Sequence, residues 1–187
     1  LVAGRGLLRL DANRGFSRKD GMAFAAALQP DGIELFEQPC GSHAWEDNAA
    51  VAAVCRVPFM LDESIYGIPD IERAATIPGV THIKLKLKKV GGVESLISAL
   101  ELISARGMTP VLGDGVSADI GCWFEACVAA ALVRNAGEMN GFMKTERSMF
   151  LNEMPVKDGA ISLPLGYWPA IDMDAVKHYS VRETHFG

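Results

Sequence analysis

The chain of 187 residues can build one sizeable hydrophobic core, and its 49% apolar and 22% charged residues are typical of a globular protein. A formal charge of −5 and an isoelectric point near 5.4 argue against nucleic-acid binding, which needs clustered basic residues. No apolar run reaches the roughly 18 residues of a membrane span, and the first residues do not resemble a signal peptide. We therefore expect a cytoplasmic protein without nucleic-acid or membrane partners.

Short apolar segments alternate with longer helical patterns along most of the chain, and Ser17 stands in the N-cap position of the first helix. The predicted strands are residues 6–13, 33–39, 57–64, 81–87, 108–115 and 137–142. The predicted helices between them are residues 17–29, 44–55, 68–77, 91–107 and 118–137. Because the first segment already reads as a strand and does not begin with Met, we expect the complete protein to extend further at its N-terminus.

Six strands in strict β-α order predict a parallel sheet covered by helices. The closed form of this arrangement is the (β/α)8 barrel, which typically needs about 250 residues, so the chain would supply six of its eight units. An open doubly wound sheet is the alternative, but no G-x-G-x-x-G sequence follows the first strand to favour dinucleotide binding. We expect residues 1–150 to form the partial barrel. Residues 151–187, where the alternation ends, should form a C-terminal segment at its edge.

Three consecutive predicted strands end in an acidic residue: Asp11, Glu37 and Asp62, at steps of about 25 residues. Because parallel strands of a barrel end at one face, the three carboxylates should converge there. Like charges repel at short range unless a cation lies between them, and Mg²⁺ prefers octahedral oxygen ligands. Each acid alone could instead cap a helix or pair with a lysine. Three acids in register favour a metal site.

The next predicted strand carries two lysines, Lys84 and Lys86, on one face, because side chains alternate along a strand. Lys86 lies one further step of about 25 residues beyond Asp62. A partly desolvated lysine beside a divalent cation has a lowered pKa, which suits a general base. The alternative is a solvated lysine in a basic loop, which the neighbouring Lys88 and Lys89 would favour.

The ordered segments DAN, FEQP, DES, IKLKLKKVGG and DGAISLP resemble the enolase superfamily, in its muconate-lactonizing-enzyme and mandelate-racemase branch. The resemblance covers nearly the whole chain. It implies a TIM (β/α)8-type barrel of which the chain holds strands 3 to 8. It also implies that Asp11, Glu37 and Asp62 bind Mg²⁺, or Mn²⁺ in its place.

The same resemblance implies that Lys86 is the catalytic base, because it opens a K-x-x-K-x-G-G pattern, with Lys84 as the second choice. It further implies that Asn13 and Glu63 support the metal ligands. Asp114 on the seventh strand and Glu138 on the eighth are candidates for substrate contact, and hydrogen bonding at the barrel mouth is the alternative for both.

The chain departs from the family pattern in several places. The second catalytic lysine, in a K-x-K on the family's second strand, is not in this sequence, and neither is the N-terminal capping domain. The seventh strand reads VLGDGVSADIG, which has neither an ESSIG-like sequence nor the histidine of the mandelate-racemase type. Racemization by a Lys/His pair is therefore disfavoured.

The resemblance implies Mg²⁺-dependent abstraction of a proton α to a carboxylate, with a stabilised enediolate intermediate. The outcome could be racemization or epimerization, cycloisomerization, or dehydration, and the sequence does not choose among them. The substrate would be a small-molecule carboxylate and the full-length protein a homo-oligomer. Two alternatives stay open: a non-catalytic truncated barrel fragment, and an aldolase that forms a Schiff base through Lys86.

Overall fold

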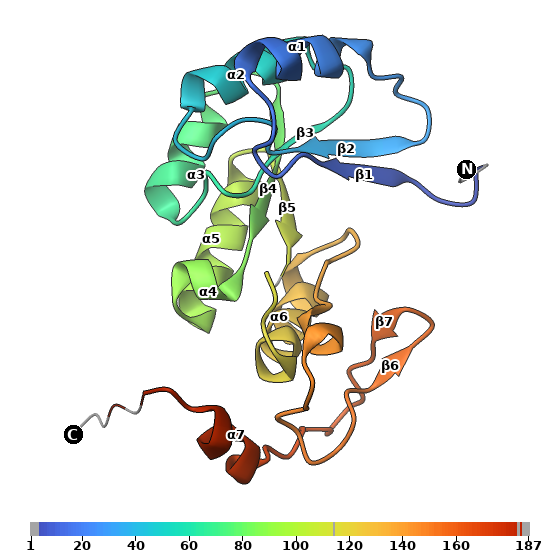
Figure 1. The fold of residues 1–187 in the computed structure, drawn as a ribbon, viewed down its shortest axis with the longest axis vertical. Coiled ribbons are helices and arrows are strands. Elements are labelled where there is room, and N and C mark those ends of the chain that lie inside the picture. The colour runs from blue at the N-terminus through green and yellow to red at the C-terminus, as the bar shows by residue number, and fades with distance from the viewer. Residues whose placement is uncertain (1–3, 114, 183, 185–187) are drawn as a thin grey trace. The chain divides into compact units, whose positions relative to one another are not determined.

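A parallel sheet forms the first part of the computed structural model, which describes residues 4–113, 115–182 and 184. Within that part of the chain, five strands form one sheet in the order β1-β2-β3-β4-β5 (Figure 1). They are β1 (Leu8–Asp11), β2 (Ile33–Glu37), β3 (Phe59–Leu61), β4 (Val80–Leu85) and β5 (Thr109–Leu112). The pairings β1-β2, β2-β3 and β3-β4 are all parallel, which confirms the predicted α/β fold with a parallel sheet.

Helices connect the successive strands, as the β-α alternation predicts. They are α1 (Arg18–Ala27), α2 (Trp45–Val54), α3 (Ile68–Ala75), α4 (Leu87–Val90), α5 (Val93–Ala105) and α6 (Asp119–Leu132). The Ser17 hydroxyl accepts a hydrogen bond from the Asp20 N–H at 3.2 Å and caps α1, as predicted. None of the helices in the described ranges has the length and apolar character that a membrane-spanning segment needs.

The C-terminal region contains more regular structure than the sequence analysis predicts. It holds a 3₁₀ helix η1 (Gly141–Lys144), an antiparallel hairpin of β6 (Val156–Lys157) and β7 (Ala160–Ile161), and helix α7 (Met173–Tyr179). The hairpin turns at Asp158 and Gly159, which both have positive φ, as its two-residue turn requires. The predicted strand over 137–142 is an isolated parallel bridge between Gly113 and Glu138, so six complete βα units are not confirmed.

The chain divides into two compact units. One comprises the residues up to Leu85 together with Lys89–Val111, and the other comprises Lys86–Lys88 together with the residues from Leu112 on. These units do not follow the expected boundary after residue 150. That residues 151–187 form a separate segment at the barrel edge stays a prediction.

Side-chain alternation separates two faces of the sheet in the first unit. On one face Phe36 packs against Phe24 of α1 and Phe59 of β3, with ring centroids 5.3 and 6.3 Å apart. On the other face Leu35, Met60 and Val111 form a fully buried cluster. Because residues two apart on a strand share a face, Glu37 follows Leu35, and Asp62 follows Met60, on this second face.

Candidate functional site

The carboxyl ends of three neighbouring strands carry the three acidic residues that the sequence singles out. β1 ends at Asp11, β2 ends at Glu37, and Asp62 directly follows β3. Asp11 and Glu37 are register partners, and Glu37 is the partner of Met60, two residues before Asp62. The structure therefore brings the three residues to one edge of the sheet, as predicted.

Glu37 is the most buried member of this group, with 1% of its surface exposed. The pKa of Glu37 is raised to about 8, mainly by burial and also by the charges of Asp11 and Asp62, although Lys84 offsets part of the rise. Both neighbouring carboxylates thus act on Glu37. The three acids share one electrostatic environment in which an added positive charge would be stabilising.

Lys84 of β4 supplies one positive charge to this group. Its Nζ donates hydrogen bonds to Oε1 and Oε2 of Glu37 at 3.0 and 3.2 Å, and both side chains are buried. This contact agrees with the expectation that Lys84 faces the same side of the sheet as the acids. It also shows that Lys84 serves as a counter-ion for Glu37.

Lys89 supplies a second positive charge, which the sequence analysis did not assign to the site. Its Nζ donates to the carboxylate and to the main-chain oxygen of Asp62, the latter at 2.6 Å, and both side chains are buried. The ammonium group also lies 5.5 Å from the centroid of the Tyr66 ring. The signal in the sequence was the second lysine of the K-x-x-K-x-G-G pattern.

The chemistry of the donors fits a divalent cation, although lysines contact two of them. Within the described ranges, no group of three His, Cys, Asp or Glu side chains is arranged to hold a metal ion. Three carboxylates are nevertheless the hard oxygen ligands that Mg²⁺ prefers. Burial first, and the charges of Asp11 and Asp62 after it, raise the pKa of Glu37. A bound cation would need Lys84 and Lys89 to release carboxylate oxygens.

The predicted supporting residues Asn13 and Glu63 lie next to candidate ligands. The main-chain N–H of Asn13 donates to Asp11 Oδ1 at 2.8 Å, and Asn13 has a φ of 44°. Glu63 Oε1 lies 3.1 Å from Nε of Arg14, and Glu63 Oε2 is buried without a hydrogen-bond partner in the described structure. The Arg14–Glu63 ion pair therefore joins the loop after β1 to the loop after β3.

Lys86 directly follows β4 and belongs to the second unit. Its side chain lies against Gly115, because a Cβ on Gly115 would come within 3.0 Å of Lys86 Cδ. The neighbouring Lys88 donates through Nζ to the Gly115 oxygen at 2.7 Å. The N–H of Leu87 donates to Oε1 of the buried Glu125 of α6 at 2.6 Å. These contacts hold the Lys86 segment against the loop that follows β5.

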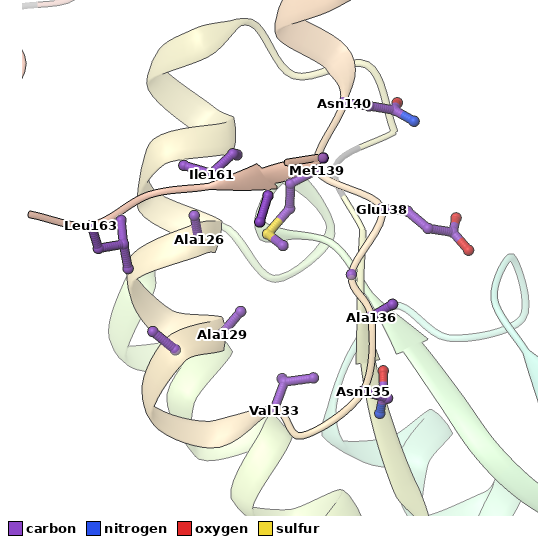
Figure 2. Close-up of a pocket in the computed structure, with 14 residues that line it drawn as sticks. Ala126, Ala129, Val133, Asn135, Ala136, Glu138, Met139, Asn140, Ile161 and Leu163 are labelled. Carbon is purple, nitrogen blue, oxygen red and sulfur yellow. The ribbon is translucent and has the colours of Figure 1, made fainter. Parts of the chain in front are cut away.

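Glu138 continues the sheet pattern beyond β5 in the second unit. Its N–H donates to the Leu112 oxygen at 3.0 Å, and it forms the parallel bridge to Gly113. Figure 2 shows Met139 pointing toward α6, into a cavity of about 490 Å³, whereas the Glu138 carboxylate turns away from it. The carboxylate thus lies on the opposite face of this segment. Asp114, the other predicted substrate contact, lies outside the described residues.

Comparison with known proteins identifies related sequences. A family model described as "Enolase C-terminal domain-like" matches residues 2–169. An o-succinylbenzoate synthase of Listeria innocua is 26% identical over 180 residues, covering 92% of this chain and 47% of that protein. An L-Ala-D/L-Glu epimerase of Clostridium acetobutylicum is 32% identical over 108 residues, covering 57% and 30%. The chain spans about half the length of the curated relatives that match most of it.

Solved structures share the fold. The muconate lactonizing enzyme from Pseudomonas putida superimposes with a TM-score of 0.83 at 20% identity, covering 95% of this chain and 51% of that one. A substrate-liganded L-Ala-D/L-Glu epimerase from Bacillus subtilis superimposes with a TM-score of 0.77 at 23% identity, covering 88% and 46%. At these identities the likeness concerns the fold of the chain.

Proposed function

Since this chain belongs to the enolase C-terminal domain-like family, we propose that it is the larger part of the barrel of an enzyme that abstracts a proton α to a carboxylate. The substrate is a small carboxylate, and the products are those of an epimerase, a cycloisomerase or a dehydratase. Relatives named as epimerases, cycloisomerases and o-succinylbenzoate synthases support this reaction class.

The residues at the strand ends would hold Mg²⁺ or Mn²⁺. Asp11, Glu37 and Asp62 offer three carboxylates from three consecutive strand ends, which is the donor chemistry that these ions prefer. When bound, the ion supplies positive charge that stabilises an enediolate as the substrate loses its proton. The observation that carries the proposal is geometric: Asp11 and Glu37 are register partners at the ends of β1 and β2, and Asp62 follows β3, whose Met60 is the register partner of Glu37.

Lys86 would accept the α-proton of the substrate. Lys84 and Lys89 contact Glu37 and Asp62, and these contacts suit them to neutralising carboxylates. Lys86 lies beside Gly115 in the loop after β5, and the carboxyl ends of barrel strands are where active sites form. Asn13, Glu63, Asp114 and Glu138 would support the ligands or contact the substrate.

The proposal is tested by metal-dependent exchange of the α-proton in D₂O. The purified protein is freed of metal with EDTA and mixed with panels of dipeptides, N-acyl amino acids, acid sugars and hydroxyprolines. Mass spectrometry then follows deuterium uptake. We expect uptake on at least one carboxylate, lost with EDTA and restored by Mg²⁺ or Mn²⁺. The control is Asp31→Asn, a change in the exposed loop before β2, which should leave uptake unchanged.

Two other outcomes would contradict this proposal, and each would favour a different function. Uptake that does not depend on added metal, together with borohydride trapping of a carbonyl substrate on Lys86, would favour the Schiff-base aldolase. Binding of Mg²⁺ without any exchange across the whole panel would favour a barrel fragment that is not catalytic by itself.

A further inference from the structure

Gln38 directly follows Glu37 and is completely buried, although its side chain is polar. Its Oε1 accepts hydrogen bonds from the main-chain N–H groups of Asp62 and Ser64 at 3.0 and 3.2 Å. Its Nε2 donates to the Cys40 oxygen and to Ser64 Oγ at 3.1 and 2.8 Å. The amide group therefore joins the loop after β2 to the loop after β3, where Asp62 lies.

The main chain of Gln38 bonds to β3 and to the loop after β1. Its N–H donates to the Met60 oxygen at 3.0 Å, and its oxygen accepts from the Arg14 N–H at 2.8 Å. Gln38 also has a φ of 35°, a left-handed conformation that non-glycine residues adopt at an energetic cost. The surrounding hydrogen bonds hold it there. Gln38, which directly follows Glu37, is thus bonded to the loop that follows Asp11 and to the segment that contains Asp62.

Asn48 of α2 provides a structural comparison inside the same unit. It is also a buried amide, and it makes four hydrogen bonds: to the N–H and oxygen of Cys40 and to the oxygens of Gly41 and Ala44. These bonds secure the loop after β2 from the helix side. They do not involve Asp62 or Ser64, so Asn48 stabilises the loop without linking it to the next strand.

We propose that Gln38 is a positioning residue, which fixes Asp62 relative to Glu37 so that the two carboxylates can bind one divalent cation. The proposal rests on the metal-dependent function proposed above. Residues that orient metal ligands through hydrogen bonds typically change metal affinity by about 10–100-fold when mutated. The four side-chain bonds of Gln38 place it in that role.

The test compares Gln38→Met with Asn48→Leu, each of which removes one buried amide and its four hydrogen bonds. Amide hydrogen exchange by NMR in the metal-free proteins measures protection at Asp62 and Ser64. Isothermal titration with Mn²⁺ then measures metal affinity, and thermal unfolding measures the general loss of stability. For Gln38→Met we expect loss of protection at Asp62 and Ser64 and Mn²⁺ binding weakened about 10–100-fold. For Asn48→Leu we expect protection and affinity near the wild-type values at a similar loss of stability.

Equal weakening of Mn²⁺ binding in the two variants, or unchanged protection at Asp62 and Ser64 in Gln38→Met, would overturn the positioning role. If Gln38→Met does not fold, Ser64→Ala removes one of the four bonds and should give a smaller loss of protection and affinity. Unchanged values there would overturn the role as well. A wild-type protein that binds no Mn²⁺, while Gln38→Met still exposes the two amides, would overturn the proposed function and support the positioning of Asp62 by Gln38.

Discussion

Lys84 Nζ lies 3.0 Å from Oε1 and 3.2 Å from Oε2 of Glu37, and the two side chains are 5% and 1% exposed. An ammonium group this close ordinarily lowers the pKa of a carboxyl group. Burial outweighs it here and raises the pKa of Glu37 to about 8, with Asp11 and Asp62 adding to the rise. Burial, more than the neighbouring charges, therefore keeps the pKa of Glu37 above its usual value.

Replacing Lys84 by Met should destabilise the protein most strongly above about pH 8, where Glu37 is ionised in wild type and the substitution removes the counter-ion of this buried carboxylate. Removing one partner of a buried ion pair costs about 3–5 kcal/mol, and we expect a loss near the lower end at about pH 9. Urea unfolding of the metal-free protein measures it. The control is Lys19→Met, because Lys19 is exposed on α1. Equal losses for the two variants would contradict the role of Lys84.

The raised pKa of Glu37 gives the metal-free protein an unusual pH dependence. The folded state keeps a proton on Glu37 up to about pH 8, whereas the unfolded chain releases it near 4.5. The folded state therefore binds more protons between these two values, and the contribution of Glu37 to the free energy of unfolding falls as pH rises through that window. Unfolding of wild type and Glu37→Gln in EDTA from about pH 4 to 9 should show this fall only in wild type. Parallel profiles would refute it.

Replacing Lys89 by Met should strengthen Mg²⁺ binding. In the structure the Lys89 ammonium bonds the Asp62 carboxylate, so a cation must displace it. Hydrogen bonds to charged groups contribute about 1.5–3 kcal/mol, and removing this competitor should tighten binding by about tenfold or more. Isothermal titration with Mg²⁺ measures the affinity, with Lys88→Met as the control in the same basic segment. Weaker binding by Lys89→Met would mean that Lys89 supports the metal ligands instead.

Gly115→Ala should impair proton abstraction more than metal binding. Gly115 has a φ of 56°, and an added Cβ would lie 2.8 Å from Cε of Lys88 and 3.0 Å from Cδ of Lys86. The substitution strains the loop and pushes both side chains aside. We expect a lower rate of α-proton exchange at saturating substrate, with Mn²⁺ affinity close to that of wild type. The control is Gly159→Ala, in the β6-β7 turn and also at positive φ. An exchange rate lowered equally by both changes would indicate a general loss of folding.

The sequence predicted the features of this site that depend on periodicity. The strand ends at Asp11, Glu37 and Asp62, and the facing of Lys84 toward them, follow from alternation and from the regular βα step. The role of Lys89 did not, because its ammonium reaches Asp62 only when the chain turns into α4 after β4, and the spacing of residues does not reveal that turn. The role of Gln38 did not follow either, because three of its four side-chain bonds go to main-chain groups, which the identity of the bonded residues does not reveal.

The C-terminal region likewise contains one feature that the sequence could predict and one that it could not. The Asp158-Gly159 pair is a recognised hairpin signal, and it could have predicted β6 and β7. The segment 137–142 contains two glycines and few apolar residues, and it forms one bridge at Glu138 instead of a strand. A short segment of this kind depends on its neighbours for its structure, so local sequence alone predicts it poorly.

Proton abstraction by Lys86 is tested by the rate of α-proton exchange in Lys86→Met, measured in D₂O on whichever carboxylate the wild-type protein exchanges, with Lys84→Met alongside. Met keeps most of the lysine stem and removes the proton acceptor. We predict that Lys86→Met lowers the rate by at least about 10²-fold, the lower end for loss of a general base, with Mn²⁺ affinity little changed. Lys84→Met should retain more exchange and lose more stability. If exchange is abolished in Lys84→Met but stays near the wild-type rate in Lys86→Met, the base is Lys84 and not Lys86. Wild-type rates in both variants would contradict proton abstraction by this site.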